Sequence, residues 1–495
     1  MEKRVVFRTD GNAAIGLGHL VRCQALAQAL QPAFAGVFVV RDPAPAFVQQ
    51  LAAAALAIWP IAADLPTGLP EAEWLASQLA PTDIVVLDDY GFTPDYQRLL
   101  AAQGIPLVCL DDLITPPIWA DLVLNQAGGI GTAAYAAVPL AQLCLGPAYA
   151  LLRPPFWQQS SNDSAEPLRL FLNMGGADPG NQTLALLPRL RQQFPGYLVE
   201  VVTGAVYPHQ AELAAYAQPL SAQVRLHHNL SANDLAALLR ACQVLVCPPS
   251  GVAYECCAAG GAVLLHLTAD NQAAMFDFLV SEGLAVSLAE ALALPETELP
   301  TLADQQVPRQ RALFDGKASE RLQDVFQELA ASQQYQLRRA TTDDAALYFA
   351  WANDPAVRQN AIHPEPIAWE THVAWLGRRL EDANSYLYML STAAGEPVGQ
   401  VRVEFDGPGQ PGIIDYSLAS AFRGQGLGSV LLRRALQRLR HERPTLAGGA
   451  VLGQVKVSNP ASARVFELLR FMRQAAVTLQ GEAYEVFRLD FPPDL

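Results

Sequence analysis

The sequence predicts an α/β protein built from two consecutive open parallel sheets and a smaller α+β unit. Short apolar runs alternate with Ala/Leu/Gln-rich helical stretches through residues 4–155, and the same alternation restarts at residue 168. After residue 335 the pattern changes to a helix followed by long strands. Alternating strands and helices are typical of βαβ units, which form parallel sheets. The length of 495 residues also fits about three domains at roughly 150 residues each.

Apolar runs predict the strands of the first two units. In the first unit the runs are 4–9, 36–41, 83–87, 106–110 and 121–124. The polar stretch 158–166 then interrupts the pattern, and we place a domain boundary there. In the second unit the runs are 168–173, 198–203, 244–247 and 262–267. A helix is expected over 231–242, where Ser231 and Asp234 have capping-box spacing, and another after Gly251.

A polar, Gln-rich helix over 317–335 ends in Ser332-Gln333-Gln334 and is interpreted as a link to the third unit. The expected strands there are 386–391, 397–405 and 413–418, and a helix is expected over 430–439. The predicted domains are therefore 1–157, 167–330 and 336–495.

Composition excludes several classes of protein. With 51% hydrophobic and 16% charged residues, the chain is too apolar to be intrinsically disordered. A formal net charge of −15 disfavours general binding to nucleic acid or to anionic membranes. The sequence has no apolar run approaching about 20 residues and does not begin like a signal peptide. We therefore expect a soluble, cytoplasmic protein that binds neither nucleic acid nor membranes. The seven cysteines form no CxxC pair, so we expect no metal and no disulfide framework; the oligomeric state is not indicated.

A glycine-rich loop follows the first predicted strand and leads into a helix. The loop ends in Gly16-Leu17-Gly18-His19, which places His19 at a helix N-terminus. Backbone amides and the helix dipole there disfavour imidazolium, so a neutral imidazole that can accept a proton is expected. Gly16 and Gly18 would let a ligand approach the backbone closely. The alternative from spacing alone is a glycine-rich turn with a surface histidine.

Several spaced motifs in residues 4–320 resemble the nucleotide-sugar hydrolases of pseudaminic acid biosynthesis. They are listed here as they stand in the sequence: Arg8-Thr9-Asp10-Gly11, Ile15-Gly16-Leu17-Gly18-His19-Leu20-Val21-Arg22, Leu26-Ala27, Asp88-Asp89-Tyr90, Asp111-Asp112, Leu124-Asn125-Gln126 and Gly146-Pro147-Ala148-Tyr149-Ala150-Leu151-Leu152-Arg153. That family is related to the GT-B glycosyltransferases, in which two Rossmann-like domains hold a nucleotide sugar in the cleft between them without a metal.

The resemblance implies roles for residues of the first unit. His19 would be the general base that takes a proton from the water attacking the anomeric carbon, while UDP leaves with its charge held by helix-terminal amides. Asp10 and one of Asp88 or Asp89 would orient water or sugar; the alternative is that these carboxylates cap helices. Gly16, Gly18 and Arg22 are the other candidate binding residues.

Glycine turns in the second unit are candidates for binding a nucleotide. Gly175 and Gly176 end a strand where bare backbone amides could meet a diphosphate. Ser250 and Gly251 form a similar turn after a later strand. In GT-B relatives a glutamate placed as Glu255 is hydrogen-bonded to both ribose hydroxyls, because a carboxylate has two acceptor oxygens. The resemblance also places Asn271 and Gln272 near the sugar.

The third unit carries a glycine turn between a strand and a helix. The turn is Arg423-Gly424-Gln425-Gly426-Leu427-Gly428, and Asn459-Pro460-Ala461-Ser462 follows about 30 residues later. Unobstructed amides at such a turn can hold a pyrophosphate, and Arg423 adds local positive charge. Together the two motifs resemble the GCN5-related N-acetyltransferases (GNAT), whose loop binds the pyrophosphate of acetyl-CoA. This implies that Arg423, Gly424, Gly426 and Gly428 bind acetyl-CoA and that Asn459 bonds to it or caps its helix.

The third unit departs from that family at one position. Many relatives carry, shortly after the Asn459-type residue, a tyrosine that protonates the departing CoA thiolate. Phe466 occupies the nearest aromatic position here, and phenylalanine has no proton to donate. Ser462, Tyr416 and Tyr484 are the remaining candidates for the general acid.

Taken together, the two resemblances imply a bifunctional enzyme of pseudaminic acid biosynthesis. It would acetylate the 4-amine of UDP-4-amino-4,6-dideoxy-N-acetyl-β-L-altrosamine with acetyl-CoA. It would then hydrolyse the product, UDP-2,4-diacetamido-2,4,6-trideoxy-β-L-altropyranose, to free sugar and UDP. Two alternatives are a GT-B glycosyltransferase fused to an acetyltransferase, and a nucleotide-sugar sensor with a protein N-terminal acetyltransferase domain.

Overall fold

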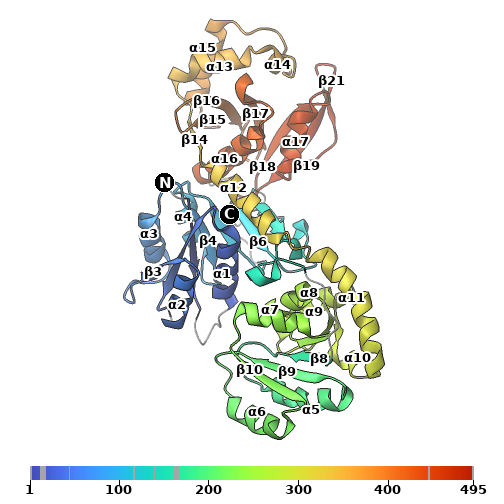
Figure 1. Ribbon diagram of the computed structural model, residues 1–495. Helices are drawn as coiled ribbons and strands as arrows, with labels where there is room; N and C mark the ends of the chain where they lie inside the picture. The colour runs from blue at the N-terminus through green and yellow to red at the C-terminus, as the bar shows by residue number, and fades with distance from the viewer. Residues whose placement is uncertain are drawn as a thin grey trace.

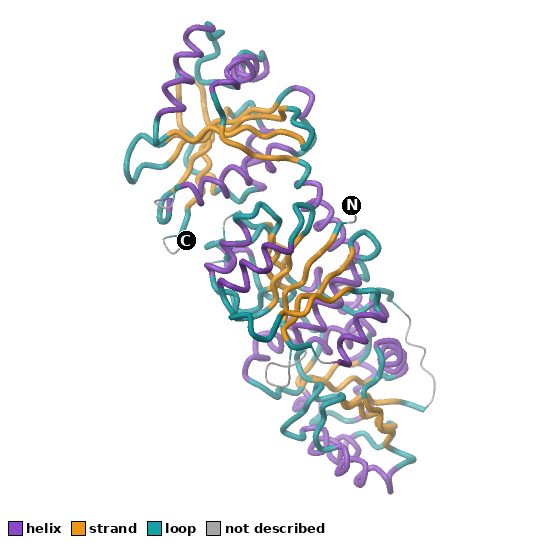
Figure 2. The backbone as a smooth tube through the Cα atoms, turned by 90° about the vertical axis from the view of Figure 1, so that its left-hand side faces the viewer, coloured by secondary structure: helices purple, strands orange, loops and turns teal. Residues whose placement is uncertain are grey.

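A computed structural model describes residues 3–11, 18–43, 45–114, 118–138, 140–159, 167–443 and 446–492. It contains three sheets that follow one another along the molecule (Figures 1 and 2). We call the parts built around these sheets the first, second and third units. The first two sheets are parallel throughout, which confirms the prediction of an α/β protein with two parallel sheets.

The first unit has a seven-stranded sheet in the order β3-β2-β1-β4-β5-β6-β7. Its strands are β1 Arg4–Thr9, β2 Ala35–Arg41, β3 Ala57–Ile61, β4 Ile84–Asp88, β5 Leu107–Leu110, β6 Leu122–Asn125 and β7 Gln142–Leu145. Its helices are α1 Gly18–Leu30, α2 Pro45–Ala53, α3 Leu69–Gln78 and α4 Pro94–Ala101. Successive side chains of β1 enter opposite cores: Val5 and Phe7 pack with α1, whereas Val6 packs with α3 and α4. Both faces of the sheet are therefore covered, as parallel sheets require.

The second unit repeats this topology in the order β10-β9-β8-β11-β12-β13. Its strands are β8 Arg169–Leu172, β9 Leu198–Thr203, β10 Val224–His228, β11 Val244–Cys247, β12 Ala262–Leu265 and β13 Val286–Ser287. Its helices are α5 Gln182–Gln193, α6 Gln210–Ala217, α7 Ala232–Ala241, α8 Gly251–Ala259, α9 Ala273–Ser281, α10 Leu288–Ala291 and α11 Leu299–Leu313. In both sheets the strand order reverses, between β1 and β4 and between β8 and β11. Ligands of open α/β sheets bind outside the carboxyl ends of the strands at such a reversal.

The third unit has a mixed sheet in the order β14-β15-β16-β17-β18-β21-β19, with β20 paired to β21. Its strands are β14 Tyr335–Arg339, β15 Ser385–Thr392, β16 Pro397–Glu404, β17 Gly412–Leu418, β18 Ala450–Lys456, β19 Met472–Arg473, β20 Val477–Leu479 and β21 Glu482–Asp490. Its helices are α13 Ala345–Ala352, α14 Pro355–Arg358, α15 Trp369–Glu381, α16 Leu427–Glu442 and α17 Pro460–Leu468. The parallel pair β17 and β18 is in register only from Gly412 to Ile414, so the two strands separate beyond that point.

Helix α12 (Ala318–Ser332), which the sequence suggested is a link, packs against the first unit (Figure 1). Leu322, Phe326 and Leu329 lie in the same buried cluster as α1 and β1. The side chain of Gln323 donates to the carbonyl of Ala29 at 2.6 Å. The polar residues of this helix therefore lie on its outer face, and its apolar residues complete the core of the first unit.

The third unit is also fixed directly to the first. Arg470 donates to the carbonyl oxygens of Val138 and of Ala141, the latter at 3.1 Å. The side chain of Gln437 donates to Asp121 at 2.7 Å, and Leu140 lies in the core cluster of the third unit. The two units thus share polar and apolar contacts, and the connection between them is a packed interface.

Loss of the Arg470 contacts should loosen this interface. A single hydrogen bond contributes about 0.5–1.5 kcal/mol, so we expect Arg470→Ala to speed amide exchange in peptides spanning residues 135–142 by about tenfold. Hydrogen–deuterium exchange of the full chain measures this. The matched control is Arg473→Ala, since Arg473 is half exposed and pairs with Glu467 and Glu485 within the third unit. Unchanged exchange in Arg470→Ala would contradict the interface described here.

Candidate functional sites at the strand ends

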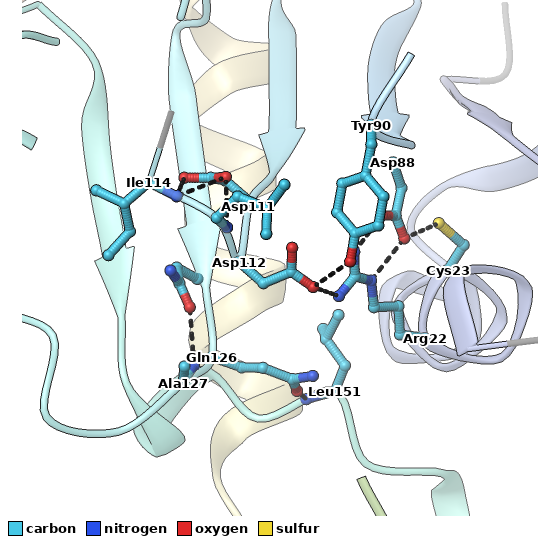
Figure 3. Close-up of polar contacts among 12 residues, drawn as sticks. Arg22, Cys23, Asp88, Tyr90, Asp111, Asp112, Ile114, Gln126, Ala127 and Leu151 are labelled. Atoms are coloured by element: carbon cyan, nitrogen blue, oxygen red, sulfur yellow. Dashed lines mark hydrogen bonds and ion pairs between the residues drawn. The ribbon is translucent and has the colours of Figure 1, made fainter. Parts of the chain in front are cut away.

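Several motif residues of the first unit meet at the carboxyl ends of β4 and β5. They line a pocket of about 290 Å³ whose walls include Arg22, Asp88, Asp89, Tyr90, Asp111 and Asp112. Figure 3 shows Arg22 between the carboxylates of Asp88 and Asp112, with Tyr90 on the side of Asp112. Motifs that lie far apart in the sequence therefore form one wall, beside the reversal of strand order.

His19 is the second residue of α1, and its side chain is buried. The imidazole lies edge-to-face against the ring of Tyr90, with ring centroids 4.9 Å apart. Tyr90 also lines the pocket, so His19 contacts a residue of the pocket wall. At Gly18 a Cβ atom would meet no atom of the described residues within 4 Å, which fits a ligand close to this backbone. Gly16 lies outside the described residues.

Arg22 and Asp88 form a bidentate ion pair, at 2.8 and 2.5 Å. Burial lowers the pKa of Arg22, but Asp88 and Asp112 more than offset this effect, and the net pKa is raised. Burial and the neighbouring Asp88 raise the pKa of the Cys23 thiol, which donates to the same carboxylate at 3.2 Å. Asp88 thus holds a permanent cation in the pocket wall.

The other two candidate carboxylates of the first unit have local partners. Asp10 accepts hydrogen bonds from the Arg8 guanidinium at 2.7 Å and from the backbone amide of Arg41 at 2.9 Å. Asp89 accepts from the amide of Gly91 at 2.8 Å and shapes its own turn. Of the predicted Asp88 and Asp89 pair, Asp88 is the one that faces α1 and Arg22.

The carboxyl end of the second sheet has two open glycine turns. Gly175 follows β8 with φ of +93° and donates its amide to Asn173 at 3.0 Å. Among the residues that the structure describes, a Cβ atom at Gly175 or Gly176 would meet no neighbour within 4 Å. Gly251 begins α8 and is equally open, and the side chain of Ser250 does not cap that helix. The first amides of α8 are therefore available to an anion.

Glu255 lies in α8 and is held by a residue from the segment that joins the first two sheets. Arg153 donates from Nε to Oε1 at 2.6 Å and from Nη2 to Oε2 at 2.7 Å. Gln272 accepts from the amide of Thr268 at 2.9 Å and so stabilises its own loop. Asn271 lies in the same short 3-10 helix; its side chain is outside the described set.

In the third unit, β17 and β18 separate next to the predicted glycine turn. Gly424 and Gly426 have φ of +75° and +74°, which L side chains rarely adopt. Gly428 lies inside α16, where a Cβ atom would be 3.1 Å from Val465. Arg423 pairs with Asp354 and donates to the carbonyl of Leu418 at 3.0 Å. Its charge therefore anchors the turn, and the turn's amides remain as donors.

The start of α17 brings together two of the three candidates for the general acid. Asn459 caps this helix by accepting from the amide of Ser462 at 3.2 Å. The hydroxyl groups of Ser462 and Tyr416 are 3.0 Å apart. Burial raises the pKa of Tyr416 although the bond to Ser462 opposes this effect, so its phenol remains protonated at neutral pH. Phe466 is buried and stacks on Phe487, and Tyr484 is buried in β21.

The pairs formed by Arg153 with Glu255 and by Arg423 with Asp354 were not anticipated. Arg153, Glu255 and Arg423 lie in motifs that the sequence singled out, yet the paired residues are 102 and 69 positions apart. Spacing along one chain does not report such contacts. Across the described ranges, no helix is long and apolar enough to cross a membrane, and no group of three or more His, Cys, Asp or Glu side chains could hold a metal ion.

Comparison with known proteins gives one family match and two curated relatives. Residues 335–472 match the family described as "Acetyltransferase (GNAT) domain". An uncharacterised protein of Methanocaldococcus jannaschii is 21% identical over 333 residues, covering 65% of this chain and 68% of that protein. The UDP-2,4-diacetamido-2,4,6-trideoxy-beta-L-altropyranose hydrolase of Campylobacter jejuni is 24% identical over 265 residues, covering 51% of this chain and 87% of that protein.

Solved structures similar to this chain cover about a third of it. A spermidine N-acetyltransferase from Vibrio cholerae, in complex with CoA and spermine, is 17% identical and has a TM-score of 0.28; the match covers 31% of this chain and 93% of that one. An aminoglycoside acetyltransferase in complex with coenzyme A is 24% identical and has a TM-score of 0.26, with the same coverage. On the family match, the C-terminal part of the chain is a GNAT acetyltransferase domain, and the chain is an enzyme.

Proposed function

We propose that the chain is a bifunctional enzyme that acetylates a UDP-activated amino sugar and then hydrolyses the product to free sugar and UDP. The observation that carries the hydrolase half is the position of His19 on the N-terminal turn of α1, against Tyr90 at the edge of the pocket. The similarity to the Campylobacter jejuni hydrolase supports the same half. The proposed domains are 1–157, 167–330 and 336–495, with the first two in a GT-B arrangement.

In the proposed hydrolysis the first two units divide the work. The amides at the start of α8 and the amide of Gly176 would hold the diphosphate, with Gly175 leaving the approach to the backbone open, and Glu255 would accept hydrogen bonds from the ribose hydroxyls. His19 would take a proton from water as the water oxygen bonds to the anomeric carbon. The bond from that carbon to the phosphate oxygen breaks, and UDP leaves with its charge held by backbone amides. Asp88 would act by fixing Arg22 in the pocket wall.

In the proposed acetylation the turn at Gly424 and Gly426 would hold the pyrophosphate of acetyl-CoA. The uncharged amine of the sugar attacks the thioester carbonyl, because a protonated amine has no free electron pair. The bond from that carbon to sulfur then breaks and releases the CoA thiolate. Tyr416 and Ser462 form a hydroxyl pair beside the separation of β17 and β18, and this pair would supply the proton to the thiolate. The sugar nitrogen loses one proton to solvent as it becomes an amide nitrogen, and the hydroxyl pair regains a proton from solvent.

Replacement of the imidazole tests the hydrolase half. General base catalysis contributes about 10²–10⁴-fold, so His19→Ala should lower UDP release from the nucleotide sugar by at least about a hundredfold. UDP affinity should remain, since His19 is assigned to the attacking water. Chromatography of UDP without any acceptor, together with calorimetry of UDP binding, measures both, and His209→Ala in the second unit is the matched control. Undiminished turnover in His19→Ala would overturn this proposal, and turnover only with an added acceptor would favour a glycosyltransferase.

Removal of one phenol tests the acetyltransferase half. Tyr416→Phe should slow CoA release by about tenfold to a thousandfold and leave the KM for acetyl-CoA unchanged. Losses in the upper part of this range are typical of removal of a general acid. Ser462→Ala should show a smaller loss in the same direction. Detection of the free thiol in the presence of a UDP-4-amino sugar measures the rate. Tyr484→Phe is the control and should react as the wild type does; a large loss there, with Tyr416→Phe active, would reassign the acid. Activity on peptides alone would contradict the sugar substrate.

A further inference from the structure

Two sequence motifs that the proposed chemistry does not use meet helix α8. The first is Leu124-Asn125-Gln126 at the end of β6, and the second is Ala150-Leu151-Leu152-Arg153 in the segment between the sheets. The side chain of Gln126 accepts from the amide of Leu151 at 2.8 Å (Figure 3). The two motifs are therefore joined to each other before they reach the second unit.

Tyr254 connects these motifs to α8. Its hydroxyl donates to the carbonyl of Gln126 at 3.0 Å and accepts from the amide of Gly128 at 3.1 Å. The side chain is buried, and both functions of its hydroxyl are used. Because Glu255 is the next residue of the same helix, the contact between the first two units places Glu255 as well.

Arg153 fixes the carboxylate of Glu255 itself. The pair is bidentate, with one guanidinium nitrogen on each carboxylate oxygen, and only 11% of the Glu255 side chain is exposed. An ionised carboxylate that is largely buried is costly unless it is paired. Arg153 therefore pairs the Glu255 carboxylate and holds it in one orientation at this position.

The bidentate pair leaves acceptor capacity on Glu255. A carboxylate offers about four lone-pair sites on two oxygens, and Arg153 uses one on each. One further acceptor site then remains on each oxygen, which matches two neighbouring hydroxyl groups. These two free acceptor sites are the reason to connect Arg153 with recognition of a diol.

We propose that Arg153 is a positioning residue for ribose recognition: it orients the Glu255 carboxylate so that both oxygens face the diol of the bound nucleotide. This inference rests on the proposed function, because it assumes that UDP binds at α8. It adds a residue from the segment between the sheets, and it gives the motif at 150–153 a role that lies outside the reacting atoms.

A comparison of UDP with 2′-deoxy-UDP tests this role. A hydrogen bond to a charged group contributes about 1.5–3 kcal/mol, so calorimetry of the wild-type full chain should show at least about tenfold tighter binding of UDP. In Arg153→Gln this preference should fall to about twofold or less, and in Arg153→Lys it should recover in part. A merely structural loss would weaken the binding of both nucleotides alike and leave the ratio of their affinities unchanged.

The controls separate this inference from the function on which it rests. Arg169→Gln removes a similar Arg–Glu pair, with Glu200, at the opposite end of the second sheet, and should leave the ratio at its wild-type value. Glu255→Gln should abolish the preference for UDP. If the wild type does not bind UDP, both the proposed function and this inference fail. If the preference depends on Glu255 and persists in Arg153→Gln, the inference alone is overturned.

Discussion

The reversal of strand order in each parallel sheet is the constraint on which the candidate sites depend. At β1 and β4, and again at β8 and β11, neighbouring connections leave in opposite directions, so the strand ends between them stay uncovered. His19 and Asp88 lie beside the first reversal. The turns at Gly175 and Gly251 lie beside the second. Each unit thus provides backbone amides and one set of side chains at the same edge of its sheet.

Charge pairing decides which groups remain available at these edges. The chain carries a formal net charge of −15, yet Asp10, Asp88 and Glu255 each contact an arginine. These carboxylates act as acceptors that are already oriented, and their cations are held in turn. The groups with free capacity are backbone amides at helix starts and the second lone pairs of paired carboxylates, which suits a ligand that brings both phosphate oxygens and hydroxyl groups.

Much of the fold could be predicted from local sequence. The strands 198–203 and 244–247 agree with β9 and β11 to the residue, because valine and leucine dominate both segments. The edge strands β3 and β7 were missed: β3 contains Pro60, and both are short and partly exposed. Ser231 does cap α7. The sequence also places the candidate residues after predicted strands, and their roles remain predictions. The packing of α12 on the first unit and the pairing of Arg153 with Glu255 depend on tertiary contacts that spacing does not encode.

The interface between the first and third units holds the two proposed activities at a fixed separation. The hydrogen bond between Gln126 and Tyr254 joins the first unit to the second. The proposed hydrolysis requires one nucleotide to lie across the first two units, between α8 and His19. A crystal structure of the full chain with UDP tests it most directly. We expect the ribose on Glu255, the diphosphate at the amides at the start of α8, and the terminal phosphate directed toward His19. A nucleotide bound away from both Glu255 and His19 would contradict it.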